Sequence, residues 1–574
     1  MMNMICSHYS TGYGDQFISP ASTRATISKI VQRTIRRVPR VLINIKTGRL
    51  YDKTEQAATF ESLPVFNELV SSMTTRTDFV RIKSEVRQYF QYVMFSHKWE
   101  NNEPLFQQVI DKSVYSLDKS PTRDKLQTFC KIVRDAGFEW AWSDTCCINK
   151  SDHFVLQEAL VAMFEWYQGS VIVIVFLRGV RSWSQLGALV ESVWNTRAWT
   201  LQEYIAARVL RFYTEDWTPY LNLQLPNHKE SPEIISEMER ATGVSAQQLT
   251  ALRPGLTSIR EKLRLASTRH TTLVEDAAYS LLGILSVSGI PAIYGEGNGS
   301  LGRLLAHVVT VSGDASNLAW AGEAGNFNSC LPAHISVFRG PATSHLPPPI
   351  LDNDMEKIIT APHPSSLDLD AALKLYNRLS ELSAPWFAAS RMKLPCITFQ
   401  LPPLTPYRTR SGHVYRVNTT TFGLVEIKTR QDLSRMEPLY LVHPWLDTIL
   451  DRGAMHRGTV VEDDTTPPPS PDTDNEETLD EEIEDDSAFL PEPELPPLPP
   501  PSQATMPADR EMRARRLVAR LRQPFGALLL TLATKGRIGI DYRRVAADSM
   551  ITVQFQESVS LADLLDNVRT FDVL

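Results

Sequence analysis

The chain has 574 residues, of which 43% are hydrophobic and 22% charged, as is typical of a globular protein with two to four domains. Its longest apolar runs, such as residues 171–177, fall far short of the roughly 20 residues that a membrane-spanning helix needs, so we expect no membrane span. The six cysteines form no CxxC pair, which argues against a disulfide framework or a zinc site and predicts a reduced, cytoplasmic protein.

The net charge of −7 is unevenly distributed. Residues 462–494 contain fifteen acidic residues and no Lys or Arg, so the rest of the chain is mildly basic. The surrounding stretch, residues 461–508, is rich in proline and acids and has too little apolar surface to fold. We therefore predict an acidic, disordered tether there.

Residues 1–84 are predicted to form a basic, largely helical extension with a short strand at 41–45. Within residues 1–40 there is one acidic residue and apolar side chains recur at helical spacing from Ile27 to Thr34. Two interpretations remain open for this stretch: a mitochondrial targeting segment, or a basic surface helix that packs on the following domain.

Residues 85–230 alternate between strand and helix patterns. The predicted strands are 92–95, 139–142, 171–177 and 209–213, and the predicted helices are 122–137, 157–168 and 199–207. Residues 171–177 are continuously apolar and β-branched, as expected for a strand buried on both faces. This alternation predicts an α/β domain whose parallel sheet is flanked by helices.

The rest of the chain divides into three further predicted parts. Residues 231–320 are mostly helical, with a helix at 301–311 after a glycine-rich turn. Residues 321–460 contain a helix at 373–382 and strand-like pieces at 397–401, 415–417 and 424–427. Residues 509–574 begin with a basic helix at 513–522 and contain two strands, 538–542 and 550–555, that we expect to complete the preceding β-containing domain. The tether can neutralise the basic helix, so we do not predict a nucleic-acid partner.

Three motifs place polar side chains at the ends of apolar runs. They are Tyr92 to Trp99 (YVMFSHKW), Trp142 to Asn149 (WSDTCCIN) and Arg197 to Glu203 (RAWTLQE). In parallel α/β folds, the carboxyl ends of the strands present such side chains to ligands. The three motifs are therefore predicted to meet at one edge of the sheet.

These motifs resemble those of the fungal heterokaryon-incompatibility (HET) domain. The matching residues are Ser96, His97 and Trp99; Asp144, Cys147, Ile148, Asn149 and Asp152; Met163 and Tyr167; and Arg197, Trp199, Thr200, Gln202 and Glu203. Residues 271–283 and 294–297 resemble the segment that follows this domain in many mushroom-type members. Lys150 and Val155 depart from the pattern, which commonly has Gln and an acid at these places.

The HET domain is itself similar to TIR domains. That resemblance implies a TIR-like sheet, self-association, and a match between Trp199-x-x-x-Glu203 and the motif that holds the glutamate of TIR NAD hydrolases. Glu203 would be catalytic and NAD a substrate, with no metal and no cofactor. The alternative for Glu203 is an ordinary acid near a helix N-terminus, which the helix dipole favours.

Six further residues are predicted to bind substrate, and three of them have a structural alternative that we state here. They are Ser96, His97, Trp99, Asp144, Arg197 and Trp199. Trp199 could stack on a nicotinamide or adenine ring or pack in the core. Arg197 could pair with a phosphate or with Asp144, or form a surface salt bridge, and His97 could be a base or phosphate donor or a structural hydrogen-bonding residue. Ser96 and His97 should point to opposite faces of their strand, which argues against a hydrolase triad.

The resemblance therefore implies a HET-domain effector of fungal nonself recognition and cell death. One hypothesis is an NAD glycohydrolase switched on by self-association. The other is a non-enzymatic signalling adaptor that assembles with itself or with a nonself-recognition receptor, in which case Glu203 is structural.

Overall fold

The computed structural model describes residues 18–74, 77–243, 245–247, 259–340, 369–404, 406–409, 412–436, 438–445, 507–535, 540–556 and 558–574. The chain divides into two compact units, Met1–Thr343 and Ser344–Leu574. Residues 321–340, which the sequence analysis assigned to the second domain, fall in the first unit. The other predicted domain boundaries remain predictions.

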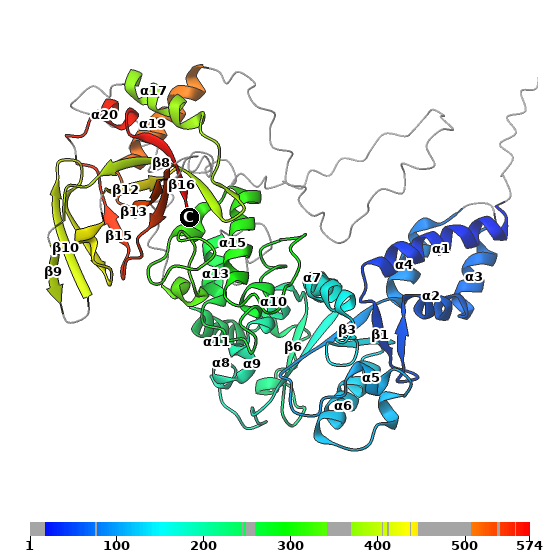
Figure 1. The fold of residues 1–574 in the computed structure, drawn as a ribbon. Coiled ribbons are helices and arrows are strands. Elements are labelled where there is room, and N and C mark those ends of the chain that lie inside the picture. Colours follow the sequence, from blue (N-terminus) through cyan, green and yellow to red (C-terminus); the bar gives the residue numbers. More distant parts are fainter. Residues whose placement is uncertain are drawn as a thin grey trace, which may run out of the picture. The chain divides into compact units, whose positions relative to one another are not determined.

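The first unit is built on a six-stranded sheet (Figure 1). Its strands are β1 (Val41–Asn44), β2 (Leu50–Asp52), β3 (Tyr92–His97), β4 (Trp140–Ser143), β5 (Ile172–Leu177) and β6 (Leu210–Thr214). The order is β2-β1-β4-β3-β5-β6, in which β4, β3, β5 and β6 are parallel and β1 is antiparallel to both β2 and β4. The predicted α/β class with a parallel sheet is confirmed.

Helices cover both faces of this sheet. Successive side chains of β3 point to opposite faces, so contacts made by Tyr92 and Phe95 identify the helix on each face. On one face, Phe95 stacks on Phe129 of α6 (Pro121–Asp135) at 4.4 Å between ring centroids. On the other face, Tyr92 donates a hydrogen bond of 2.6 Å to the carbonyl of Trp166 in α7 (His153–Gly169). The other helices of the sheet region are α5 (Phe106–Val109), α8 (Ala188–Glu191), α9 (Val193–Thr196) and α10 (Trp199–Ala206).

The N-terminal basic helix packs on its neighbours. It is α1 (Pro20–Arg36), and its buried face includes Ile27, Ile30, Val31 and Ile35. It contacts α2 (Lys53–Glu61), α3 (Pro64–Ser72) and α4 (Phe79–Tyr89). A packed face of this kind supports the surface-helix interpretation for the described part of residues 1–40; residues 1–17 lie outside the described residues.

The predicted helical segment after the sheet contains α11 (Pro232–Thr242), α13 (Ile259–Ala266), α14 (Asp276–Tyr279) and α15 (Gly299–Ser312). The last described residues of the first unit are held by Arg260 of α13, which donates hydrogen bonds to the carbonyls of Phe338 and Gly340. No described helix in either unit has the length and apolar character that crossing a bilayer demands.

The second unit contains a sheet that closes on itself. Its strands are β7 (Trp386–Ala388), β8 (Arg391–Gln400), β12 (Leu439–Pro444), β13 (Phe525–Lys535), β14 (Ile540–Arg544), β15 (Ile551–Val553) and β16 (Val568–Val573). The order β12-β13-β14-β16-β8 is closed by a further pairing of β8 with β12. Strands after residue 507 therefore pair with strands before residue 445, as the sequence analysis predicts. Residues 461–506 of the predicted tether lie outside the described residues.

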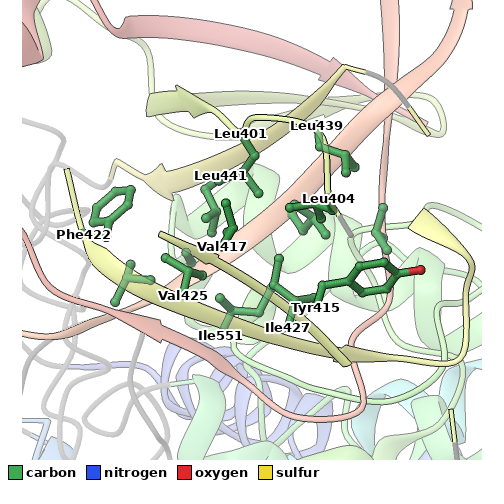
Figure 2. Packing of buried hydrophobic residues seen from close by; sticks show 14 of the residues in the cluster. Leu401, Leu404, Tyr415, Val417, Phe422, Val425, Ile427, Leu439, Leu441 and Ile551 are labelled. Atoms are coloured by element: carbon green, nitrogen blue, oxygen red, sulfur yellow. The ribbon is translucent and has the colours of Figure 1, made fainter. Parts of the chain in front are cut away.

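A smaller sheet of β9 (Pro406–Thr409), β10 (Gly412–Thr419) and β11 (Gly423–Thr429) shares a buried apolar cluster with this closed sheet. Figure 2 shows Val417, Val425 and Ile427 from the small sheet facing Leu441 of β12. The helices of this unit are α17 (Leu369–Ser380), α19 (Pro507–Leu521) and α20 (Leu561–Leu565). The cluster gives the second unit an apolar core of its own.

Candidate functional site

Ser96 and Glu203 meet at the carboxyl end of β3. The Ser96 hydroxyl donates a short hydrogen bond to the Glu203 carboxylate, and it accepts one of 2.7 Å from the indole nitrogen of Trp194. Ser96 comes from the strand, Trp194 from α9 and Glu203 from α10. The first and third motifs are thus brought together, as predicted.

The Glu203 side chain is closed off in this conformation, since the residue is only 7% exposed. Burial raises the pKa of its carboxyl to about 7, although the Ser96 hydrogen bond and the charges of Arg197 and Arg269 oppose the rise. Among the described residues, no basic side chain forms an ion pair with it. Glu203 therefore exchanges a proton near neutral pH, which suits a group in acid–base or charge-stabilising chemistry.

The second motif joins the same edge through Asp144. β3 and β4 are parallel with Phe95 opposite Ser143, so Asp144 follows its strand next to Ser96. The Asp144 carboxylate accepts a hydrogen bond of 2.7 Å from the indole nitrogen of Trp99. The ammonium of Lys150, at the place where the sequence departs from the family pattern, lies 3.2 Å from the centroid of the Trp99 ring.

Trp199 is half-buried and ties the third motif to the helical segment downstream. Its indole donates a hydrogen bond to the carboxyl of Asp276, which also accepts one of 3.0 Å from the hydroxyl of Tyr294. Burial raises the pKa of Asp276, and these two hydrogen bonds oppose that effect. Arg197 is also half-buried and forms no ion pair with a described residue, but its charge lowers the pKa of both Glu203 and Asp276.

His97 lies on the opposite face of β3, as its alternation with Ser96 predicts. It stacks on Phe95 at 4.3 Å, and its Nε2 is 3.7 Å from an Oε1 of Glu103. Burial, with the nearby charges of Lys125 and Arg197, holds its pKa well below the ordinary value, so the imidazole is neutral. The structure therefore separates His97 from the Ser96–Glu203 contact.

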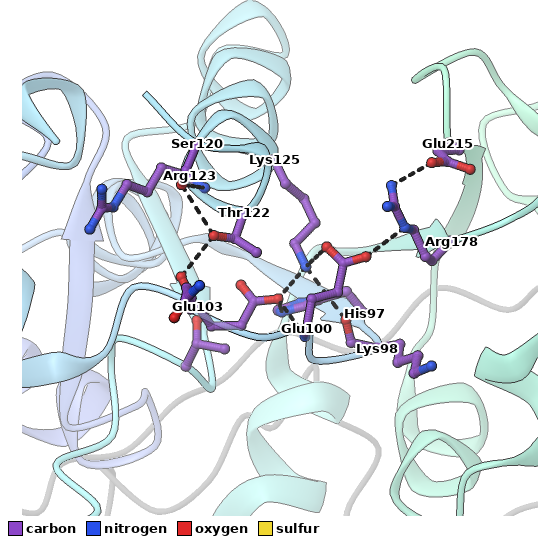
Figure 3. A network of polar contacts seen from close by, with 12 residues as sticks. His97, Lys98, Glu100, Glu103, Ser120, Thr122, Arg123, Lys125, Arg178 and Glu215 are labelled. Carbon is purple, nitrogen blue, oxygen red and sulfur yellow. Dashed lines mark hydrogen bonds and ion pairs between the residues drawn. The ribbon is translucent and has the colours of Figure 1, made fainter. Parts of the chain in front are cut away.

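The ionic network beside His97 is not evident from the sequence. Figure 3 shows Lys125 of α6 between Glu103 and Glu100, with Glu100 linked in turn to Arg178 at 2.6 Å and Arg178 to Glu215. Lys125 and Glu103 are both buried. Burial raises the pKa of Glu103 and outweighs the opposing charge of Lys125. This network fixes the loop after β3 to α6 and to the end of β5.

The sequence analysis missed Trp194, Arg269 and Asp276 as parts of this site. The sequence analysis relates residues 271–283 and 294–297 only to a downstream family segment. In the structure, Asp276 within the first range contacts Trp199, and Tyr294 within the second donates a hydrogen bond to Asp276. Nothing in the local pattern of Trp194 distinguishes a hydrogen-bond donor from a core residue. No three His, Cys, Asp or Glu side chains of the described residues gather where they could hold a metal ion.

Comparison with known proteins finds a family that is similar to part of this chain. Residues 92–184 match the family "Heterokaryon incompatibility protein (HET)". Residues 92–184 are therefore similar to the HET family. The matched range holds Ser96, Trp99 and Asp144 but ends before Arg197 and Glu203.

Part of this chain is also similar to a curated fungal protein. "Vegetative incompatibility protein HET-E-1" of Podospora anserina is 32% identical over 221 residues, which are 36% of this chain and 15% of that protein. The chain thus spans only a small part of the length of this relative. No solved structure matches the chain.

Proposed function

We propose that this chain is a HET-domain effector in fungal vegetative incompatibility, where nonself recognition triggers cell death. The proposal is supported by the match of residues 92–184 to the family and by the 32% identity to a vegetative incompatibility protein. We further propose that it acts in the cytoplasm, by self-association through a TIR-like domain, under the control of a nonself-recognition receptor protein.

For the chemistry, we propose hydrolysis of the nicotinamide–ribose bond of NAD. The observation that carries this proposal is the contact between the Glu203 carboxylate and the Ser96 hydroxyl at the carboxyl end of β3. As nicotinamide leaves with the electrons of the broken bond, the ribose carbon becomes cationic, and a fixed carboxylate stabilises it. Water then adds to this carbon and releases its proton, which gives ADP-ribose.

The remaining predicted residues take substrate-binding roles in this proposal. Trp199, four positions before Glu203, has a half-buried ring that could stack on a base of NAD. Arg197, which has no ion-pair partner among the described residues, would bind the diphosphate. Ser96 orients the carboxylate, and Trp99 and Asp144 shape the edge around it, while His97 lies on the opposite face of β3. Because Glu203 is buried, substrate entry requires that the segment carrying it moves outward, and self-association is the proposed trigger.

The test is nicotinamide release by purified, concentrated protein incubated with NAD. We expect release by the wild type and none by Glu203→Gln. Glu237→Gln is the matched control, because Glu237 is also buried but accepts hydrogen bonds from Leu189, Val190 and Tyr220 in another part of the unit. Equal release by wild type and Glu203→Gln would refute the catalytic role.

The burial of Glu203 also favours a second function, a non-enzymatic signalling adaptor. A carboxylate that is 7% exposed and hydrogen-bonded to Ser96 can be purely structural. In that case the HET domain would trigger cell death on expression in a fungal host without NAD loss, and Glu203→Gln would kill as efficiently as the wild type.

A further inference from the structure

Glu203 reaches Ser96 because of a bend between two short helices. α9 ends at Thr196, and Arg197 adopts extended backbone angles (φ −84°, ψ 141°) before α10 begins at Trp199. Trp194, before the bend, and Glu203, after it, both contact the Ser96 hydroxyl. The geometry of the bend therefore decides whether both side chains arrive at Ser96 together.

Arg269 spans this bend from the helical segment downstream. Its guanidinium donates hydrogen bonds to the Asn195 side-chain oxygen at 3.0 Å, the Arg197 carbonyl at 2.9 Å and the Thr200 hydroxyl at 2.8 Å. The Thr200 hydroxyl in turn donates to the carbonyl of Trp194 at 2.7 Å. One side chain thus connects the last turn of α9, the extended residue and the first turn of α10.

The backbone beside Arg269 strengthens the same connection. The amide of Ala198 donates to the carbonyl of His270 at 3.0 Å, and the amide of His270 donates to the carbonyl of Thr196 at 2.7 Å. The bend is therefore held on both sides by residues 269–270. A planar guanidinium with several donors in fixed directions suits this task better than a lysine ammonium.

Arg269 is buried, and no described carboxylate lies within ion-pair distance of it. Burial lowers the pKa of Arg269 to about 10, so it keeps its charge at neutral pH. The dipoles of the three acceptors must compensate for the lost hydration of that charge, which makes the arrangement sensitive to displacement of any of them.

We propose that Arg269 is a positioning residue, which fixes the bend between α9 and α10 so that Trp194 and Glu203 meet Ser96. The positioning of the bend by Arg269 is argued from the contacts above. The effect of Arg269 on activity rests on the proposed function. The downstream helical segment thereby controls the geometry of the site, although it supplies no reacting group.

Arg260 provides a matched control. It too is a buried arginine, and it donates to the carbonyls of Ala319 at 3.1 Å, Phe338 at 2.9 Å and Gly340 at 3.0 Å. It lies on α13, close in sequence to Arg269, but none of these contacts involves α9 or α10. Loss of either arginine removes three hydrogen bonds. A difference in exchange between the two variants therefore reflects where the arginine lies, and not a general loss of stability.

The test compares hydrogen exchange of the full chain carrying Arg269→Gln, Arg269→Lys or Arg260→Gln. We expect amides of residues 193–206 to exchange about tenfold faster in Arg269→Gln, with partial recovery in Arg269→Lys, and no change there in Arg260→Gln. The pKa of the Glu203 carboxyl, followed by carbon NMR, should rise above its wild-type value in Arg269→Gln only, because a positive charge and the Ser96 hydrogen bond are both weakened.

Unchanged exchange over residues 193–206 in Arg269→Gln, or equal acceleration by Arg260→Gln, overturns the proposal. If Arg269→Gln does not fold, Arg269→Lys decides, because it keeps the charge and loses the fork of donors. Nicotinamide release is measured in parallel. A wild type without release refutes the NAD hydrolase and leaves the exchange result to decide on Arg269.

Discussion

The hydroxyl of Ser96 lies against the carboxylate of Glu203, although 107 positions separate the two residues. Ser96 is the next-to-last residue of the central parallel strand β3. Glu203 lies on α10, the helix that precedes β6 in the chain. This contact places the buried carboxyl group of Glu203 at the sheet edge where the three motifs meet. Its protonation near neutral pH gives the first prediction.

Glu203→Gln should make the protein more stable above pH 7. Because the pKa of Glu203 is raised to about 7, the fold favours the protonated form. Its contribution to stability is complete below the unfolded-state pKa of about 4.5 and is lost as the pH rises through about 7. The free energy of unfolding from urea titration should therefore favour Gln by up to about 3 kcal/mol at pH 8 and by almost nothing at pH 4. The same difference at both pH values would contradict this account.

Ser96→Ala should destabilise the protein and raise the pKa of Glu203 further. The substitution removes the hydrogen bond that lowers that pKa and leaves the Trp194 indole without its acceptor. We expect a loss of about 1–3 kcal/mol in the free energy of unfolding at pH 8. Ser143→Ala is the control, because this buried hydroxyl at the end of β4 contacts Thr145 and not Glu203. An identical shift of the Glu203 pKa in both variants would count against the Ser96 contact.

Lys125→Met should destabilise the first unit strongly. It leaves the buried Glu103 carboxylate without its partner, at an expected cost of about 3–5 kcal/mol in the free energy of unfolding. The double variant Lys125→Met, Glu103→Leu should recover much of that loss, because no uncompensated charge remains. A double variant no more stable than the single one, in the same urea titration, would show that an uncompensated Glu103 charge does not cause the loss.

Leu441→Ala should affect the second unit alone. Leu441 is fully buried in the cluster between the two sheets, so its truncation should cost about 2–5 kcal/mol. Leu424→Ala, on the exposed side of β11, should change stability by less than about 0.5 kcal/mol. Calorimetry of the full chain should show a lowered transition for Leu441→Ala, with the transition of the first unit unchanged. A shift of both transitions would mean that the two units unfold as one.

The sequence predicts the first unit well where a pattern is local. Residues 171–177 form β5 almost as expected because their unbroken apolar, β-branched run suits a strand covered on both faces. The strand at residues 41–45 was also predicted, but its pairing beside β4 was not. That pairing depends on a contact between Ile43 and Ala141, which no local pattern encodes.

The candidate site shows the same division between local and distant information. The motifs gave Ser96, Asp144 and Glu203, because strand ends are recognisable from the sequence. Arg269 and Asp276 were not predicted, since a buried arginine or aspartate looks like a surface residue until its partners are known. The closure of the sheet in the second unit was missed for a similar reason: β16 joins β8 across more than a hundred residues of chain.

The most direct measurement is the rate of nicotinamide release from NAD between about pH 5 and 9, for the wild type, Glu203→Gln and Glu237→Gln. If the ionised Glu203 carboxylate stabilises the ribosyl cation, the wild-type rate should rise with pH through about 7 and then level off. Glu237→Gln should follow the wild type, and Glu203→Gln should release no nicotinamide at any pH. Wild-type protein that self-associates yet releases no nicotinamide, or Glu203→Gln with the wild-type profile, would contradict the proposed chemistry.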